Sequence, residues 1–182
     1  MSIVITGNPG VGKHTIAHEI AKRLKLSILD INDLAKNEGL FENNNDLIEI
    51  DVLKLEKIIK KQNITNKIIV GHLAPYVLEK NKVKMVIVLR RNPYHLISVY
   101  KEREYTDKKS KENSSSEILG IIANDAINRF HEKTFQINIV EQDIQKTIQK
   151  VMRVITTGKG NEVIDWLEMI KKNNDLREFF SD

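Results

Sequence analysis

Gly7-Asn8-Pro9-Gly10-Val11-Gly12-Lys13 is the stretch of sequence that decides the fold. It satisfies the pattern G-x-x-x-x-G-K, in which glycines let successive backbone N–H groups curl around a phosphate. A β-branched run at residues 2–6 precedes it, and apolar residues at helical spacing follow it over residues 16–24. We therefore expect a strand, a glycine loop and a helix, with the loop at the helix N-terminus, where the helix dipole favours an anion.

This loop predicts a site for the phosphates of ATP. The residues expected to hold them are Gly10, Gly12, Lys13, His14 and Thr15. Lys13 is also expected to be catalytic, because phosphoryl transfer needs charge neutralisation more than covalent chemistry. His14 stands where many P-loops carry the hydroxyl that ligates Mg²⁺, and a hydroxyl comes only at Thr15. We expect ATP and Mg²⁺ as cofactors, with the ion held chiefly by phosphates and water and its protein ligands unknown.

Composition places the chain among ordinary globular proteins. Its 182 residues are 41% hydrophobic and 30% charged, which is enough apolar material for one core. Cysteine is absent from the sequence, which excludes disulfides, thiolate metal sites and cysteine nucleophiles. The net charge of +4 is spread among 25 acidic residues and argues only weakly for nucleic acid. No apolar run reaches the roughly 20 residues of a membrane span, so we expect a soluble cytoplasmic protein without membrane contact.

Short apolar runs alternate with helical patterns along the rest of the chain. Strands separated by helices imply right-handed crossovers and a parallel sheet. We expect an α/β fold, a P-loop NTPase three-layer sandwich with a parallel sheet of about five strands. The further strands are expected at 27–29, 67–70, 85–89 and 135–140, and helices near 52–62, 94–104, 116–131, 143–155 and 161–172.

Two polar stretches interrupt the alternation, at 30–51 and 103–116. Long polar insertions after strand ends in such sheets are usually mobile loops over the ligand crevice. We interpret both as candidate flaps. The tail after Lys171 is polar, and we expect it to fray.

The loop also carries a family resemblance. Pro9 two residues after Gly7, and Thr15 two after Lys13, resemble the adenylate-kinase pattern G-x-P-G-x-G-K-x-T. Over residues 1–156 the chain is similar to the archaeal and eukaryotic adenylate-kinase-like family that also acts as an ATPase in small ribosomal subunit maturation. The other segments that carry this resemblance are Asp30-Ile31-Asn32-Asp33-Leu34-Ala35, Gly71-His72, Val88-Leu89-Arg90, Arg103-Glu104-Tyr105-Thr106-Asp107-Lys108-Lys109, Glu112-Asn113 and Glu117-Ile118.

The resemblance implies a broad-specificity nucleoside monophosphate kinase (ATP + AMP = 2 ADP) with ATPase activity and a role in small ribosomal subunit maturation. It implies one P-loop kinase domain over 1–182, with a monophosphate-binding segment at 30–53, a short lid at 103–113 and a C-terminal helical extension at 157–182. The implied partners are a nucleoside monophosphate, with AMP first, and a platform ribosomal protein of the small subunit. Contact with rRNA would be indirect.

Two further residues are expected to be catalytic. Arg103 lies at the edge of the lid, and its guanidinium suits bidentate contacts with ATP phosphates; an exposed helix-end arginine is the alternative. His72 follows a buried strand and is expected to position a water or a phosphate, unless the backbone satisfies it. His14 is either a general base or a surface histidine. Arg90 either contacts phosphate or only closes its strand.

Other polar residues allow plainer interpretations. Asp33 is expected to cap a helix through Leu34 and Ala35, with monophosphate binding as the alternative, and Asp51 could orient a monophosphate or a magnesium-bound water. The charge run Lys108, Lys109 and Lys111 is interpreted as a solvated face, with phosphate or RNA contact as the alternative. The helical stripe of Val163, Trp166, Leu167 and Ile170 predicts core or docking surface.

The chain departs from the family pattern at three positions. Val70 replaces an acid at the end of the third strand, Glu104 replaces a lid glycine and Val99 replaces an arginine. These departures leave two rivals to a kinase. One is an assembly factor switched by ATP whose kinase activity is incidental, and the other is a nucleotide-dependent binding module without useful turnover.

Overall fold

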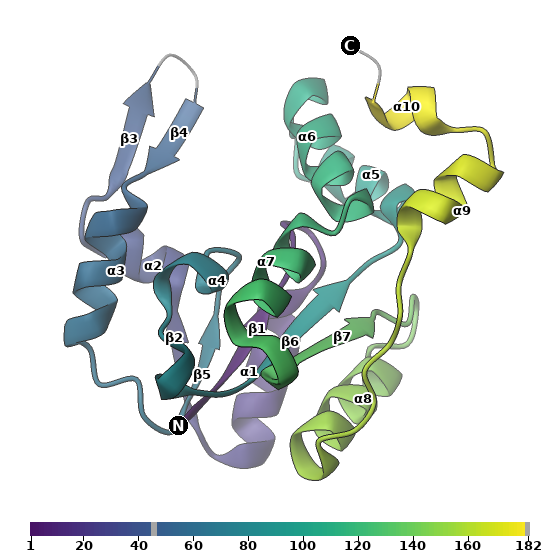
Figure 1. Cartoon of the computed structure of the whole chain (residues 1–182). Helices are drawn as coiled ribbons and strands as arrows, with labels where there is room; N and C mark the ends of the chain where they lie inside the picture. The colour runs from purple at the N-terminus through teal and green to yellow at the C-terminus, as the bar shows by residue number, and fades with distance from the viewer. Residues whose placement is uncertain (45–46, 181–182) are drawn as a thin grey trace.

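The computed structural model describes residues 1–44 and 47–180. Its main sheet has five strands in the order β2-β5-β1-β6-β7, all pairs parallel (Figure 1). The strand before the glycine loop is therefore central, and the carboxyl ends of the strands share one edge. The expected α/β fold with a five-strand parallel sheet is confirmed. The strands are β1 (Ser2–Thr6), β2 (Ser27–Asp30), β5 (Lys67–Val70), β6 (Val83–Arg90) and β7 (Thr134–Asn138).

Helices cover both faces of the sheet. Side chains alternate along β1, so Ile3 and Ile5 point to one face and Val4 to the other. The first face packs against α1 (Lys13–Leu24) and α8 (Ile144–Thr157), and the second against the remaining core helices. These are α2 (Ile31–Asn37), α3 (Val52–Lys61), α4 (Ala74–Val77) and α7 (Ile121–Phe130), with short 3-10 turns η1 (Lys80–Lys82) and η2 (His131–Lys133).

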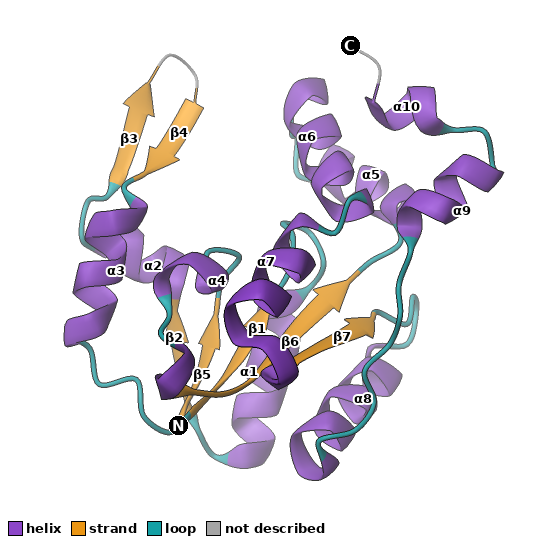
Figure 2. Cartoon of the chain, in the orientation of Figure 1, coloured by secondary structure: helices purple, strands orange, loops and turns teal. Residues whose placement is uncertain are grey.

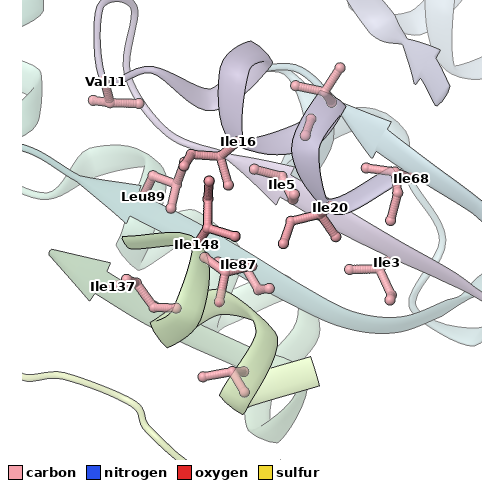
Figure 3. Close-up of a cluster of buried hydrophobic side chains, with 14 of the residues drawn as sticks. Ile3, Ile5, Val11, Ile16, Ile20, Ile68, Ile87, Leu89, Ile137 and Ile148 are labelled. Carbon is pink, nitrogen blue, oxygen red and sulfur yellow. The ribbon is translucent and has the colours of Figure 1, made fainter. Parts of the chain in front are cut away.

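An isoleucine cluster fixes α1 against the sheet (Figure 3). Ile5 of β1, Ile16 and Ile20 of α1 and Ile148 of α8 are all buried to within 1% of full burial. Fully burying one such side chain contributes about 1.5–3 kcal/mol. Because β1 and α1 flank the glycine loop directly, this cluster also sets the distance between the two ends of the loop.

The first candidate flap is folded. It contains α2 and an antiparallel hairpin of β3 (Phe41–Asn44) and β4 (Leu47–Ile50), which projects beyond the sheet edge (Figure 2). The expectation of a loop over 30–51 is therefore wrong for the described part of this stretch. Residues 45 and 46 lie outside the part of the chain that the structure describes. A hairpin of two four-residue strands is held by pairing and has too few apolar positions to show a period of two.

The second candidate flap is a helix. α5 (Pro93–Glu102) is followed by a turn and by α6 (Asp107–Ile118), which covers most of the polar stretch. Thr106 caps α6 by accepting a hydrogen bond from the backbone N–H of Lys109. The expected loop is wrong because α6 is polar nearly all round, and apolar spacing therefore does not reveal it.

The C-terminal segment packs onto α5 and α6 rather than fraying. α9 (Trp166–Lys172) and α10 (Leu176–Phe180) follow an extended stretch, and the Phe179 ring packs edge-on against Tyr94 with 5.5 Å between ring centroids. Trp166 and Ile170 are buried as expected, whereas Val163 is 96% exposed and lies before the helix. The helix starts late because Asp165 caps it. Among the described helices, none combines the length and apolarity needed to cross a membrane.

Candidate functional site

The glycine loop needs its glycines for backbone geometry. Gly10 and Gly12 both have φ of +86°, a region that disfavours side chains. A Cβ at Gly7 would lie 2.4 Å from the carbonyl oxygen of Leu89, and one at Gly10 would lie 2.9 Å from the Tyr100 ring. A Cβ at Gly12 would meet nothing within 4 Å, because that side of the loop is open. The loop is thus packed from behind and open in front.

Lys13 lies inside the curl of the loop. It is the first residue of α1 and only 5% exposed, and its Nζ donates to the backbone oxygen of Asn8 at 3.2 Å. Burial, followed by the Arg103 guanidinium, lowers the pKa of Lys13 to about 8, although Asp30 opposes them. An anion in the loop would offset both causes. The geometry therefore favours a phosphate as the partner of Lys13.

The loop forms one wall of a cavity of about 500 Å³. The β3–β4 hairpin and α2 contribute a second wall, and the turn between α5 and α6 together with α6 contributes a third. The cavity brings together the residues expected to bind ATP or to be catalytic, whose roles remain predictions. Those residues are Gly10, Gly12, Lys13, His14, Thr15, His72 and Arg103, and the cavity is also lined by Pro9, Asn32, Phe41, Ile50, Tyr105, Lys109 and Asn113.

His72 is held as a neutral imidazole. Burial and then the charge of Lys13 lower its pKa to about 4, while Asp30 opposes them. It lies at the carboxyl edge of the sheet, just after β5. A neutral imidazole there can accept or donate a hydrogen bond but adds no positive charge.

His14 makes a specific contact with Asp30. Its Nε2 lies 2.8 Å from Asp30 Oδ2, and Asp30 is paired in register with Val70, where an acid was expected. Burial tends to raise the pKa of Asp30, but hydrogen bonds from His14, Asp33 and Asn32 outweigh it and keep that pKa below its usual value. The Asp30 carboxylate thus lies on β2, next to the position on β5 where Val70 stands in place of the expected acid.

The Asp30 carboxylate is engaged by neighbouring protein groups. Asp30 Oδ1 already accepts from the backbone of α2 and Oδ2 accepts from His14, and Val70 offers no oxygen ligand. Among the described residues, no group of three or more His, Cys, Asp or Glu side chains could hold a metal ion. A hydroxyl and an acid are the residue types expected near the metal. The hydroxyl is present as Thr15 on the cavity wall, and the acid is absent at Val70.

Three polar residues have structural roles that the sequence left open or placed wrongly. Asp30, and not Asp33, caps α2, because its Oδ1 lies 2.8 Å from the Asn32 backbone N. Asp51 caps α3 by accepting from the backbone N–H of Lys54 at 2.9 Å. Arg90 lies in a buried ion pair, with its Nε 2.7 Å from Glu117 Oε1, and does not line the cavity.

Sequence reasoning undervalued the residues around the start of α6. Lys109, interpreted as part of a solvated face, lies with its Nζ 4.2 Å from the centroid of the Tyr105 ring. Tyr105 stacks on Tyr100, whose hydroxyl donates to the Pro9 carbonyl at 2.8 Å. Lys109, the two tyrosine rings and the glycine loop therefore contact one another in that order. The signal that could have revealed this contact was the spacing of two tyrosines, Tyr100 near the end of α5 and Tyr105 just before α6.

Two of the departures from the family pattern, Val99 and Glu104, lie on α5 and in the turn that follows it. Glu104 has φ of +55°, so the backbone there has the left-handed conformation for which a glycine was expected. Val99 lies against the loop, since its Cγ1 would be 3.4 Å from a Cβ built on Gly10. The backbone at Glu104 thus has the conformation expected of a glycine, and an apolar side chain lies against the loop where an arginine was expected.

A second hollow of about 340 Å³ lies on the other side of the loop, between α1 and the segment that follows β7. Arg91 spans it, with Nη1 donating to the Gly10 oxygen at 3.1 Å and Nη2 lying 2.8 Å from Glu141 Oε2. The hollow and the main cavity share Gly12 and Thr15. An elongated ligand could therefore pass over the loop from one to the other.

Comparison with known proteins gives similarity over most of the chain. A family model described as an AAA domain matches residues 3–120. A protein named "Putative adenylate kinase" from Pyrococcus furiosus is 29% identical over 175 residues, covering 94% of both chains. A protein of the same name from Saccharolobus solfataricus is 28% identical over 181 residues, covering 98% of this chain and 94% of its own.

Solved structures show the same fold at low identity. Shikimate kinase from Bacteroides thetaiotaomicron has a TM-score of 0.55 and 15% identity, over 86% of this chain and 98% of that one. Deoxyadenosine kinase from M. mycoides has a TM-score of 0.55 and 20% identity, over 86% of this chain and all of that one. At these identities the likeness concerns the fold alone, which is that of the P-loop kinases.

Proposed function

The chain belongs to the AAA domain family of P-loop proteins, and from this premise we propose that it is a nucleoside monophosphate kinase that transfers a phosphoryl group from ATP to AMP. The archaeal relatives agree with the adenylate-kinase-like resemblance of the sequence. One observation carries the proposal: a single cavity joins the phosphate loop to an apolar wall on the segment 30–53. Donor and acceptor phosphates can therefore meet in one space.

The donor half of the site is the loop with its cations. Backbone N–H groups and the α1 N-terminus would hold the β- and γ-phosphates, with Lys13 inside the curl. The hollow beside Arg91 would receive the ribose and base of ATP. Arg103 would add charge from the lid as the transferring group develops negative charge on its oxygens.

The acceptor half lies between the hairpin segment and the lid. Phe41 and Ile50 offer apolar contacts for a base, and Asn32 offers an amide whose Oδ1 is buried without a partner among the described residues. Neutral His72 lines the same cavity as this wall and Lys13, and it would orient the attacking phosphate oxygen by a hydrogen bond. The acceptor phosphate would then face the donor in line.

Closure of the lid would exclude water and favour transfer over hydrolysis. Mg²⁺ would arrive with ATP, held chiefly by its phosphates and by water. This arrangement is expected to give slower turnover than a P-loop with both an acid and a hydroxyl on the metal.

Nucleotide turnover with the pure protein tests the proposal. ADP formation from ATP, Mg²⁺ and AMP should exceed the rate without AMP, and a panel of AMP, GMP, CMP and UMP should rank the acceptors. Lys13→Ala should abolish the AMP-dependent part. If AMP adds nothing to the ATP-only rate and Lys13→Ala changes nothing, the kinase assignment is wrong.

ATP-driven assembly work is the second candidate. The absence of a metal-binding acid at Val70 favours slow hydrolysis, which suits a switch that controls binding to a small-subunit ribosomal protein during maturation. Under this candidate a ribosomal protein should stimulate ATP hydrolysis, and depletion should cause unprocessed small-subunit rRNA to accumulate. A high AMP-dependent rate with no effect of ribosomal protein would reject it.

A further inference from the structure

Glu117 of α6 is a fully buried carboxylate at the junction of four segments. Its Oε1 accepts from Arg90 Nε at 2.7 Å, from Trp166 Nε1 at 3.0 Å and from the Arg91 backbone N–H at 3.1 Å. Its Oε2 accepts from Asn8 Nδ2 at 2.7 Å. A buried charge of this kind is stable only when its partners are all in place, so moving one donor disturbs the others.

Asn8 is the phosphate-loop member of this junction. It is 3% exposed, and α6 holds its side chain at both ends, because Ser116 Oγ donates to Asn8 Oδ1 at 2.9 Å and Asn8 Nδ2 donates to Glu117. The backbone oxygen of the same residue accepts from Lys13 Nζ at 3.2 Å. Helix α6 thus orients Asn8, the loop residue whose carbonyl oxygen contacts Lys13.

Trp166 connects the C-terminal extension to the junction. Its indole is 8% exposed and provides the only side-chain hydrogen bond from α9 to Glu117 among the described residues. Tyr94 on α5 holds the extension at a separate point, where its hydroxyl bonds to Asp175 and accepts from Asn173. The extension also contacts the core elsewhere, since Ser115 Oγ donates to the Phe179 carbonyl at 2.8 Å and Glu162 Oε2 accepts from the Asn138 backbone N–H. The indole of Trp166 is the contact that reaches Glu117 directly.

We propose that Glu117 is a positioning residue for the phosphate loop, and that the C-terminal extension sets its position through Trp166. The connection runs from the indole N–H to the carboxylate, then to the Asn8 side chain, and from the Asn8 carbonyl to Lys13. The extension thereby tunes the affinity of the loop for triphosphate without touching the ligand. This inference rests on the proposed ATP site only for its functional readout.

Trp166→Phe in the full-length chain tests this connection, because it keeps an aromatic, though smaller, side chain in the cluster and removes the indole N–H. Tyr94→Phe is the control, since it removes the hydroxyl that bonds to Asp175 and Asn173 of the extension but leaves the contacts of Glu117 in place. The first readout is the set of backbone amide shifts of Gly10, Gly12 and Lys13 in nucleotide-free protein, measured by NMR. The second is the Kd for ATP by calorimetry.

The amides of the loop should shift in Trp166→Phe and stay in place in Tyr94→Phe. The Kd for ATP should rise about three- to tenfold in Trp166→Phe, because a hydrogen bond to a charged group contributes more than a neutral one but only part of its loss reaches the loop. Glu117→Gln should weaken ATP binding further while keeping the shape of the side chain. Thermal unfolding of each variant shows that it is folded.

Equal amide shifts and equal ATP affinities in Trp166→Phe and Tyr94→Phe would overturn the proposal. If the wild-type chain binds no ATP, the kinase proposal fails, yet loop amides that move only in Trp166→Phe would still support the connection. If ATP binds normally and the loop amides do not respond to Trp166→Phe, the connection is wrong and the kinase proposal stands.

Discussion

His14 Nε2 and Asp30 Oδ2 lie 2.8 Å apart, and this pair occupies the edge of the sheet where a P-loop enzyme ordinarily keeps its metal ligands. His14 stands in the place of a hydroxyl at the start of α1. Asp30 stands beside Val70, one strand from the expected acid. A histidine and a carboxylate that contact each other thus lie at this edge, next to Val70.

Asp30 also caps α2, and the two roles can be separated by substitution. Asp30→Asn should keep the cap, because asparagine caps helices as well as aspartate does, and should lose only the contact with His14. Asp30→Ala should lose both the cap and the contact with His14. Its free energy of unfolding should be about 1 kcal/mol lower than that of Asp30→Asn. Urea unfolding of the two variants measures the difference. Equal stabilities would show that the cap contributes nothing.

The low pKa of Lys13 predicts a pH dependence of ATP binding. In the free protein this pKa is about 8. Bound phosphates raise it, so binding takes up protons above about pH 8, and affinity should fall by up to about tenfold per pH unit there. Calorimetry between pH 7 and 9, in two buffers of different ionisation enthalpy, measures the affinity and the proton uptake. Lys13→Arg stays charged and should flatten the dependence, whereas an affinity of the wild type that is constant up to pH 9 would contradict it.

His72 predicts a loss of stability in acid. Its pKa is about 4 in the folded protein, against an ordinary value of 6.5, so the unfolded state binds the proton first. The free energy of unfolding should therefore fall as pH drops from about 6.5 to about 4. His72→Asn should remove up to about 3 kcal/mol of this loss. Denaturant curves at pH 7 and pH 4.5 give the comparison, and an identical loss in wild type and variant would show that His72 does not titrate as described.

Sequence reasoning predicted those parts of the fold that depend on local pattern. The glycine loop between a β-branched strand and an amphipathic helix required the central β1–loop–α1 unit, and buried runs such as the one at 67–70 predicted the parallel sheet. The parts missed include the hairpin, α4, α6 and α10, which are polar or short. They are held by pairing, caps and a few distant contacts, none of which has a period in the sequence.

The site shows the same division. Residues 10–15 were predicted because phosphate binding by backbone needs glycines at fixed spacing. The carboxylates could not be assigned, because capping depends on which residue comes just before the helix. Asp30 and Asp33 are three residues apart, and only the structure shows that α2 starts at Ile31. Glu117 could not be foreseen either, since its donors come from Asn8, Arg90 and Trp166, which are far apart in the chain.

Neighbouring lysines on α6 provide a sharp test of the lid. Lys109 lines the main cavity and lies over the Tyr105 ring, whereas Lys108 lines a groove toward α10. Lys109→Met should lower kcat/KM for ATP with AMP by about tenfold, because a cation near transferring phosphates contributes on the order of 1–2 kcal/mol to the transition state.

Lys108→Met is the matched control. It removes the same charge from the same helix at a distance of one residue, so both variants change the net charge of the protein equally. Its kcat/KM should stay close to that of the wild type, and the difference should persist at 0.3 M salt if Lys109 acts at short range. Equal losses in the two variants would mean that the lysines act only through the overall charge of the lid, which is the solvated face that their sequence pattern first suggested.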